Sequence, residues 1–164
     1  MTEQGPPASA LDTDSEYRAA VVDLIAVLAY GELTAFEVMW NAYYRQTIER
    51  VKGVVGPLPT HHPFYVLLEA SGSDAERMRG SLEQMLETAM GDNLILDATL
   101  STSNASAAAI WRIRDSSVEL GRSFPFAARM GFDVSIAIER MEEYADTLDA
   151  RVKAIDPQAF TIVM

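Results

Sequence analysis

The stretch FYVLLEASGSDAERMRGSLEQMLETAMG, residues 64–91, carries the clearest secondary-structure pattern of the chain. Its first seven residues are mostly aromatic or branched, and turn-forming residues flank them, which is typical of a strand. Ser73 and Glu76 then have the S-x-x-E spacing of a capping box, so we expect a helix to begin there. Its apolar positions recur every three or four residues until Gly91, where we expect the helix to end.

Similar patterns lie on both sides of this stretch. Residues 34–40 alternate as in a strand, and the segment 53–63 carries three prolines and two glycines, which predicts a loop. The amphipathic spacing elsewhere predicts helices at 15–30, 41–51, 104–120 and 139–155, and further strands at 94–100, 131–138 and 160–164. Five helices would then alternate with five strands, which by itself favours a mixed domain of parallel βαβ units.

The two ends of the chain differ from its middle. Residues 1–13 contain one glycine and two prolines among small polar residues, which predicts a disordered leader before a domain at 14–164. Residues 160–164, FTIVM, have a strand pattern with no polar tail. We therefore expect the chain to be a piece of a longer protein, cut inside its last strand. A strand that completes the sheet at this point is the alternative.

Composition excludes several classes of protein. The chain has 164 residues, of which 49% are hydrophobic, enough for one domain with its own core. It has no cysteine, so disulfides, zinc–thiolate sites and a thiol nucleophile are excluded. Lys and Arg number 13 against 24 Asp and Glu, a net charge of -11, so we expect neither nucleic acid nor anionic lipid as a partner. No apolar run approaches the ~20 residues that span a bilayer, and without a signal peptide we expect a cytoplasmic protein.

The common catalytic and phosphate-binding motifs are absent. The chain contains no GxGxxG, GxxxxGK[ST], GxSxG or HExxH sequence. His61 and His62 are its only histidines, and they are adjacent in the proline-rich loop. Metal ligands usually converge from spaced positions, so we expect no metal site. The carboxylates of residues 139–149 lie on the polar side of their predicted helix, which is typical of a solvated face.

One charged residue lies among apolar ones on the helix predicted at 104–120. At about 100° per residue, Arg114 is about 40° from Ile110, inside an arc of apolar and small side chains. A guanidinium there needs a partner, because burying an unpaired charge is costly. An ion pair within the domain, an anionic ligand held by the guanidinium, and a side chain that reaches solvent are the alternatives. The carboxylates on predicted strands that could pair with it are Glu37, Glu69, Asp97 and Asp133.

Four motifs occur in the order LTAFEVMW (33–40), HPFYVLLEASGS (62–73), AAIWRIRDSSVE (108–119) and GFDVSIAIERME (131–142). At these separations they resemble the C-terminal domain of the FAD-linked oxidases of the vanillyl-alcohol-oxidase type. That family includes D-2-hydroxyglutarate dehydrogenases, D-lactate dehydrogenases and the D subunit of glycolate oxidase. The resemblance extends from about residue 20 to the last residue.

The resemblance implies a different fold from the one that alternation favours. It implies an α+β domain in which a single, mainly antiparallel sheet has helices packed on one side, a ferredoxin-like cap over a flavin. FAD would be bound mainly by an N-terminal domain absent from this chain, which becomes the expected partner. The family's metal and base histidines lie in a G-H-x-G-D-G-N segment beyond residues 159–164, so we expect no catalytic residue and no activity in this chain alone. An exposed apolar face without its flavin domain predicts a homo-oligomer.

The resemblance also gives Arg114 a role. Residues 111–115, WRIRD, match a W-x-[LI]-R-[ED] helix motif whose arginine holds the substrate carboxylate. The Thr and Lys that the D-2-hydroxyglutarate enzymes add appear here as Val118 and Gly131. We therefore expect a smaller, lactate- or glycolate-like D-2-hydroxy acid as substrate. A stand-alone ferredoxin-like module for ligand binding or dimerisation, without redox activity, is the alternative.

Overall fold

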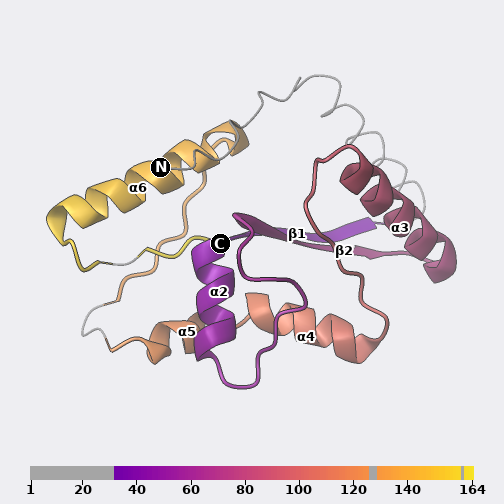
Figure 1. The fold of residues 1–164 in the computed structure, drawn as a ribbon, viewed down its shortest axis with the longest axis horizontal. Coiled ribbons are helices and arrows are strands. Elements are labelled where there is room, and N and C mark those ends of the chain that lie inside the picture. Colours follow the sequence, from indigo (N-terminus) through magenta and orange to yellow (C-terminus); the bar gives the residue numbers. More distant parts are fainter. Residues whose placement is uncertain (1–31, 126–128, 160) are drawn as a thin grey trace, which may run out of the picture. The chain divides into compact units, whose positions relative to one another are not determined.

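The computed structural model describes residues 32–125, 129–159 and 161–164 (Figure 1). The predicted leader and the helix predicted at 15–30 lie outside the described residues. Contacts divide the chain into two compact units. The described part of the first unit comprises residues 32–36 and 68–100. The second unit comprises residues from 37 to 67 and from 101 to 164.

Two strands form an antiparallel sheet, and each strand has residues in both units. They are β1 (Glu32–Trp40) and β2 (Phe64–Ser71), which confirms the strands predicted at 34–40 and 64–70. Burial alternates along the start of β2: Tyr65 and Leu67 are buried, whereas Phe64 and Val66 are exposed. One face of this strand therefore contributes to the core.

The first unit contains one long helix, α3 (Ala75–Gly91). The predicted end at Gly91 is confirmed, but the predicted capping box is wrong. Asp74 is the N-cap, and its carboxylate accepts a hydrogen bond of 3.0 Å from the backbone N–H of Arg77. An aspartate caps as well as a serine and adds a negative charge at the positive end of the helix, so the residue after Ser73 takes the role.

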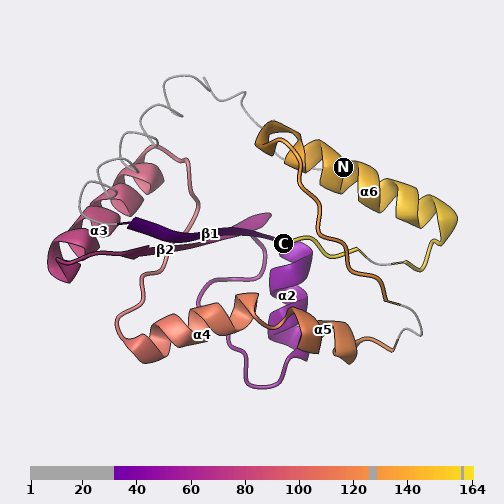
Figure 2. The same cartoon turned by 180° about the vertical axis from the view of Figure 1, so that it is seen from behind.

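The second unit holds the remaining helices. They are α2 (Asn41–Arg50), α4 (Asn104–Arg114), α5 (Ser117–Ser123), the 3₁₀ turn η1 (Ile138–Arg140) and α6 (Met141–Ile155). Helix α2 packs against α4 and α5 (Figure 2). Among the described residues, the buried apolar side chains all belong to this unit: Met39, Tyr43, Tyr44, Val51, Val54, Tyr65, Leu67, Ile113, Leu120 and Ala145. The second unit therefore supplies the rigid frame for a site.

The predicted loop at 53–63 folds over the start of α2. The side-chain amide of Asn41 donates to the carbonyls of Thr60 and His62, at 2.8 and 2.7 Å. The ring of Tyr44 stacks on Tyr65 with centroids 3.6 Å apart. A Cβ atom at Gly56 would lie 2.5 Å from the hydroxyl of Tyr44, so glycine is required there for close packing.

Three predicted strands are wrong. Residues 94–100 and 131–137 and the described part of 160–164 are not strands in the structure. Alternation shows only that a segment could be a strand, because a strand forms where a neighbour supplies backbone hydrogen bonds. The last segment makes such a bond at one point, where the N–H of Trp40 donates to the carbonyl of Val163 at 3.3 Å.

The helix predicted at 104–120 is interrupted. Helix α4 ends at Arg114 and α5 begins at Ser117. Between them the hydroxyl of Ser116 donates to the carbonyl of Arg112, and such side-chain bonds compete with the helical pattern of the backbone. The α+β prediction is confirmed, and so is the antiparallel sheet. The ferredoxin-like arrangement and the packing of helices on one side of the sheet stay predictions.

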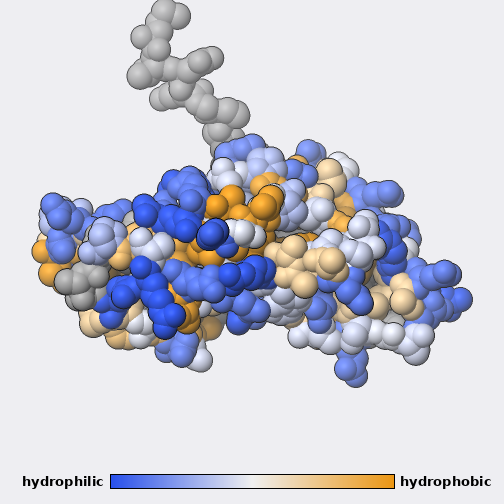
Figure 3. All heavy atoms as spheres, turned by 90° about the horizontal axis from the view of Figure 1, so that it is seen from below, coloured by the Kyte–Doolittle hydropathy of each residue, from blue (hydrophilic) through white to orange (hydrophobic). Residues whose placement is uncertain are grey.

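Apolar side chains are exposed along residues 130–136. Met130, Phe132, Val134 and Ile136 alternate there and are 84%, 76%, 50% and 39% exposed. Elsewhere hydrophilic side chains cover most of the face drawn in Figure 3, with apolar patches between them. Among the helices that the structure describes, none is both long and apolar enough to cross a membrane.

Candidate functional site

Helix α4 carries Arg114 at its C-terminal end. The predicted cap at Ser103 is confirmed: its hydroxyl accepts from the N–H of Ser106 at 3.1 Å, and the hydroxyl of Ser106 accepts from the N–H of Ser103 at 2.9 Å. This reciprocal capping fixes where the helix begins. The register that follows places Ile113 in the core, 1% exposed, and Arg114 beside it.

Tyr43 of α2 fixes the other end of α4. Its side chain is 1% exposed, and its hydroxyl donates to the carbonyl of Arg114 at 2.6 Å and to that of Ile113 at 3.0 Å. The last carbonyls of a helix lack the usual partners within the helix. The carbonyl of Ile113 also accepts from the backbone N–H of Ser116 at 3.3 Å, so the contact with Tyr43 matters most for the carbonyl of Arg114. Sequence reasoning missed Tyr43. An aromatic hydroxyl at a core position indicates a buried partner, but not which one.

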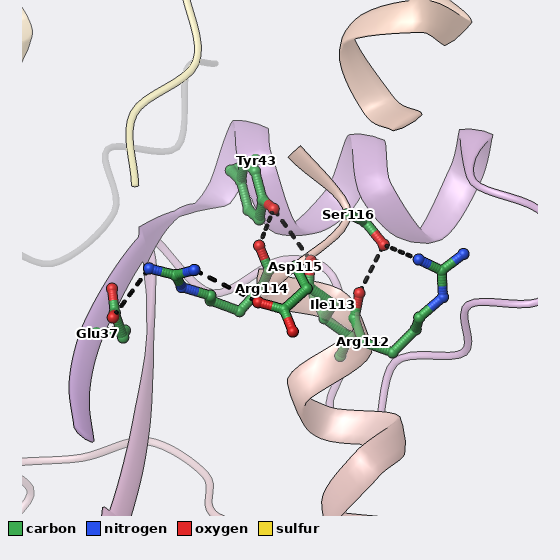
Figure 4. Close-up of polar contacts among 7 residues, drawn as sticks. All are labelled: Glu37, Tyr43, Arg112, Ile113, Arg114, Asp115 and Ser116. Atoms are coloured by element: carbon green, nitrogen blue, oxygen red, sulfur yellow. Dashed lines mark hydrogen bonds and ion pairs between the residues drawn. The ribbon is translucent and has the colours of Figure 1, made fainter. Parts of the chain in front are cut away.

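The guanidinium of Arg114 lies between two carboxylates (Figure 4). Its Nη2 atom is 3.1 Å from Oε1 of Glu37 on β1, and its Nη1 atom is 3.4 Å from Oδ1 of Asp115. The side chains of Arg114 and Glu37 are each 34% exposed. The Nε atom of Arg114 is buried and has no hydrogen-bond partner among the described residues. Of the four carboxylates considered from the sequence, Glu37 is therefore the one paired with Arg114.

Electrostatics keep Arg114 charged and Tyr43 neutral. Burial lowers the pKa of Arg114, but the charge of Glu37 and the hydrogen bonds to Asp115 and Glu37 outweigh it, so the pKa lies above its ordinary value. Burial also raises the pKa of Tyr43 to about 12, which keeps its hydroxyl a neutral donor. A guanidinium has more N–H donors than these two contacts use, so Arg114 can bind a further carboxylate.

Arg112 differs from Arg114 although both lie in the last turn of α4. Its Nη2 atom is 2.6 Å from Oε2 of Glu119, and its Nη1 atom donates to the hydroxyl of Ser116 at 3.3 Å. The hydrogen bond to Glu119 and that carboxylate's charge raise the pKa of Arg112. In Figure 4 the two guanidinium groups point away from each other. Arg112 is therefore a matched control for Arg114.

The other residues considered from the sequence do not join this group in the contacts that the structure shows. Val118 lies on α5 and is 61% exposed, and Gly131 is exposed in a segment that is neither helix nor strand. The rings of His61 and His62 lie 4.5 Å apart in the loop. Within the described ranges, no three or more His, Cys, Asp or Glu side chains are placed to hold a metal ion.

An open groove of about 400 Å³ runs along α6 in the same unit. Residues 136–137 and one face of the helix line it, including Arg140, Tyr144 and Arg151. The ion pair of Arg140 with Glu143 there is more than two thirds exposed on both sides, at 69% and 68%. None of the residues around Arg114 lines this groove, and its charges are solvated, so we place the candidate site at Arg114.

Known proteins similar to this chain form one group. The family model for the C-terminal domain of FAD linked oxidases matches residues 15–164. "Probable D-2-hydroxyglutarate dehydrogenase, mitochondrial" from Oryza sativa subsp. indica is 33% identical over 131 residues, which cover 79% of this chain and 23% of the relative. A "D-2-hydroxyglutarate dehydrogenase" from Xanthomonas citri pv. viticola is 27% identical over 146 residues, 88% of this chain and 29% of the relative.

Another relative has a different name. A protein from Schizosaccharomyces pombe named as a mitochondrial D-lactate dehydrogenase is 30% identical over 87 residues, 53% of this chain and 16% of the relative. The chain spans about a quarter of the length of the curated relatives that it matches over most of its own length.

Proposed function

Because the chain belongs to the family of FAD-linked oxidase C-terminal domains, we propose that it forms the substrate-binding part of a larger FAD-dependent oxidoreductase acting on a D-2-hydroxy acid. The observation that carries this proposal is the state of Arg114. Its guanidinium is charged, held by Glu37 and left with donors to spare, including a buried Nε without a partner among the described residues. A substrate carboxylate is the anion that such a group binds in paired contacts.

The role of this chain is then to bind and orient. Arg114 would hold the carboxylate of the hydroxy acid and so fix the direction of its Cα–H bond, which is a positioning contribution to the rate. Accepting the hydride is the chemistry that FAD supplies when bound. The chain's own residues hold the substrate while that happens.

The described residues do not offer a site for FAD itself. Its diphosphate is typically held by a glycine-rich turn that opens onto a helix N-terminus. Gly53 and Gly56 lie in a loop instead, and Gly56 packs closely against the side chain of Tyr44. We propose, as the family resemblance implies, that FAD is bound mainly by a part of the parent protein outside this chain.

Purified from cells, the 164-residue chain is expected to be colourless, without the flavin absorbance at about 450 nm. The reason is the proposal that FAD is bound mainly outside this chain. An absorbance spectrum after gel filtration checks this, with the full-length parent from the same host as the positive control. Stoichiometric flavin on the chain alone contradicts it.

We propose a substrate with one carboxylate and a small side chain, similar to lactate or glycolate. Most of the similar proteins are named for D-2-hydroxyglutarate and one for D-lactate, so the names by themselves favour the larger substrate and this proposal rests on the residues of the chain. Val118 and Gly131 offer no side-chain donor for a second carboxylate, and Val118 is 61% exposed on α5. The lack of a side-chain donor at these two positions, and not their place in the structure, supports the smaller substrate.

Activity of the full-length parent with an artificial electron acceptor tests the substrate class. D-lactate and glycolate are expected to give a higher kcat/KM than D-2-hydroxyglutarate, and L-lactate serves as the stereochemical control. A preference for D-2-hydroxyglutarate would contradict the substrate proposal alone. If no 2-hydroxy acid is oxidised, the proposed function is wrong.

We also propose that the isolated chain self-associates through residues 130–136. Their alternating apolar side chains are exposed, and Phe132 is the largest of them at 76% exposed. Burial of such a face against a second copy is favourable, at about 25 cal/mol per Å² of apolar surface. Light scattering is expected to show an oligomer that Phe132→Glu weakens, whereas Phe36→Glu, a change of the same kind in the other unit, serves as the control. A monomer at high protein concentration contradicts this.

The cytoplasmic location of the parent remains a proposal from composition. It rests on the acidic sequence of net charge -11. The Oryza and Schizosaccharomyces relatives are named as mitochondrial. Cell fractionation of the full-length protein tests the location.

A further inference from the structure

We infer that Glu37 is the positioning residue that aims the guanidinium of Arg114 at the substrate. This inference rests on the proposed function and assigns a role to a second residue of the same site. Glu37 comes from β1 and Arg114 from the end of α4, so two separate elements meet at this contact. The 3.1 Å distance from Nη2 to Oε1 is that of a charge-assisted hydrogen bond.

Arg114 needs such a partner because, apart from the contact of 3.4 Å with Asp115, only its backbone is otherwise held. Tyr43 fixes the carbonyl of Arg114 at 2.6 Å, which anchors the first atoms of a long side chain. Beyond that point the side chain is flexible, and ordering it costs about 2 kcal/mol of rotamer entropy. A second contact at the far end spares the substrate much of this cost, since the guanidinium is already in place.

Glu37 is better suited to this role than Asp115. Asp115 is adjacent in sequence, its contact is longer at 3.4 Å, and its side chain is 57% exposed. Glu37 is 34% exposed and belongs to a strand that pairs with β2. The strand is held by backbone hydrogen bonds, so its carboxylate is a fixed reference point for the guanidinium.

The contact leaves Arg114 able to bind an anion. Glu37 uses one donor of the guanidinium through one oxygen, not a paired grip through two. The ion pair neutralises Arg114 locally but does not saturate it, and the buried Nε has no hydrogen-bond partner among the described residues. The proposed role of Glu37 is to hold the guanidinium in position. A neutral hydrogen-bond acceptor at residue 37 is therefore expected to hold it as well.

Steady-state kinetics of the full-length parent with its hydroxy acid test this inference. Glu37→Ala is expected to raise KM about 10-fold with little change in kcat, because weaker positioning lowers binding of substrate and transition state alike. Glu37→Gln keeps an oxygen at the same position and is expected to stay within about 3-fold of the unmodified enzyme. Glu119→Ala removes the equivalent ion pair of Arg112 and is expected to leave KM unchanged.

The outcomes separate this inference from the proposed function. If Arg114→Ala leaves kcat/KM unchanged, the proposed function fails and the role of Glu37 fails with it. If Arg114→Ala impairs the enzyme but Glu37→Ala leaves KM unchanged or lowers it, only the positioning role is overturned. A Glu37→Gln enzyme as impaired as Glu37→Ala also overturns it. An equal melting temperature of the three Glu37 forms shows that altered folding does not explain the kinetics.

Discussion

Arg114→Ala in the full-length parent is expected to lower kcat/KM for the hydroxy acid about 100-fold or more. The loss corresponds to about 3 kcal/mol, the size expected for a charge-assisted contact to a carboxylate that is removed in the transition state. Arg114→Lys is expected to recover little of it, because an ammonium group cannot make the paired contact of a guanidinium. Initial rates with an artificial electron acceptor measure both variants.

The control lies two residues away. Arg112→Ala removes a guanidinium of the same helical turn that is engaged with Glu119, at 2.6 Å, and it is expected to leave kcat/KM near that of the unmodified enzyme. A loss of activity in both variants would indicate general damage to α4 and not a substrate contact.

Stability separates the substrate role from a purely structural ion pair. An ion pair that is one third exposed contributes at most about 1 kcal/mol to the free energy of unfolding. Arg114→Ala is therefore expected to change the melting temperature of the 164-residue chain by only a few degrees. Unchanged kinetics together with a large loss of stability would end the substrate proposal.

The position of Arg114 could be predicted because it depends on local periodicity. The 3.6-residue repeat of α4 places Arg114 on the same side as Ile110, whatever packs against that side. The identity of its partner depends on the fold. Four carboxylates fitted the sequence equally well, and only the path of β1 brings Glu37 within 3.1 Å.

The role of Tyr43 at the end of α4 could not have been predicted, because it depends on contacts between residues far apart in the sequence. The pattern of α2 places it on a buried face, but the carbonyls that it contacts belong to residues 113 and 114, about 70 positions away. Such long-range contacts leave no trace in local spacing. The same limit explains the wrong strands at 94–100 and 131–138, where the alternating pattern is present but no strand of the described residues pairs with them.

Tyr43→Phe is expected to destabilise the chain more than its single lost oxygen suggests. It leaves the carbonyl of Arg114 without the donor that now holds it, whereas the carbonyl of Ile113 keeps the backbone N–H of Ser116 at 3.3 Å. Unsatisfied buried groups of this kind cost about 1–3 kcal/mol. For a domain of this size each kcal/mol lowers the melting temperature by about 2–4 °C. Tyr144→Phe, in the open groove along α6, is the control and is expected to change little.

The alkaline limb of the stability curve tests the same contact independently. Burial raises the pKa of Tyr43 to about 12 in the folded chain, whereas an unfolded tyrosine has a pKa of about 10. The stability that comes from keeping the hydroxyl protonated is then fully present below pH ~10 and is lost as the pH rises through ~12. Tyr43→Phe lacks this group, so the difference in unfolding free energy between the two proteins should be constant up to pH ~10 and shrink above it. Denaturant unfolding at a series of pH values measures that difference. A difference that stays flat across this range, or a Tyr43→Phe melting temperature equal to that of Tyr144→Phe, would show that the hydroxyl does not hold the end of α4 and that Arg114 is anchored by other contacts.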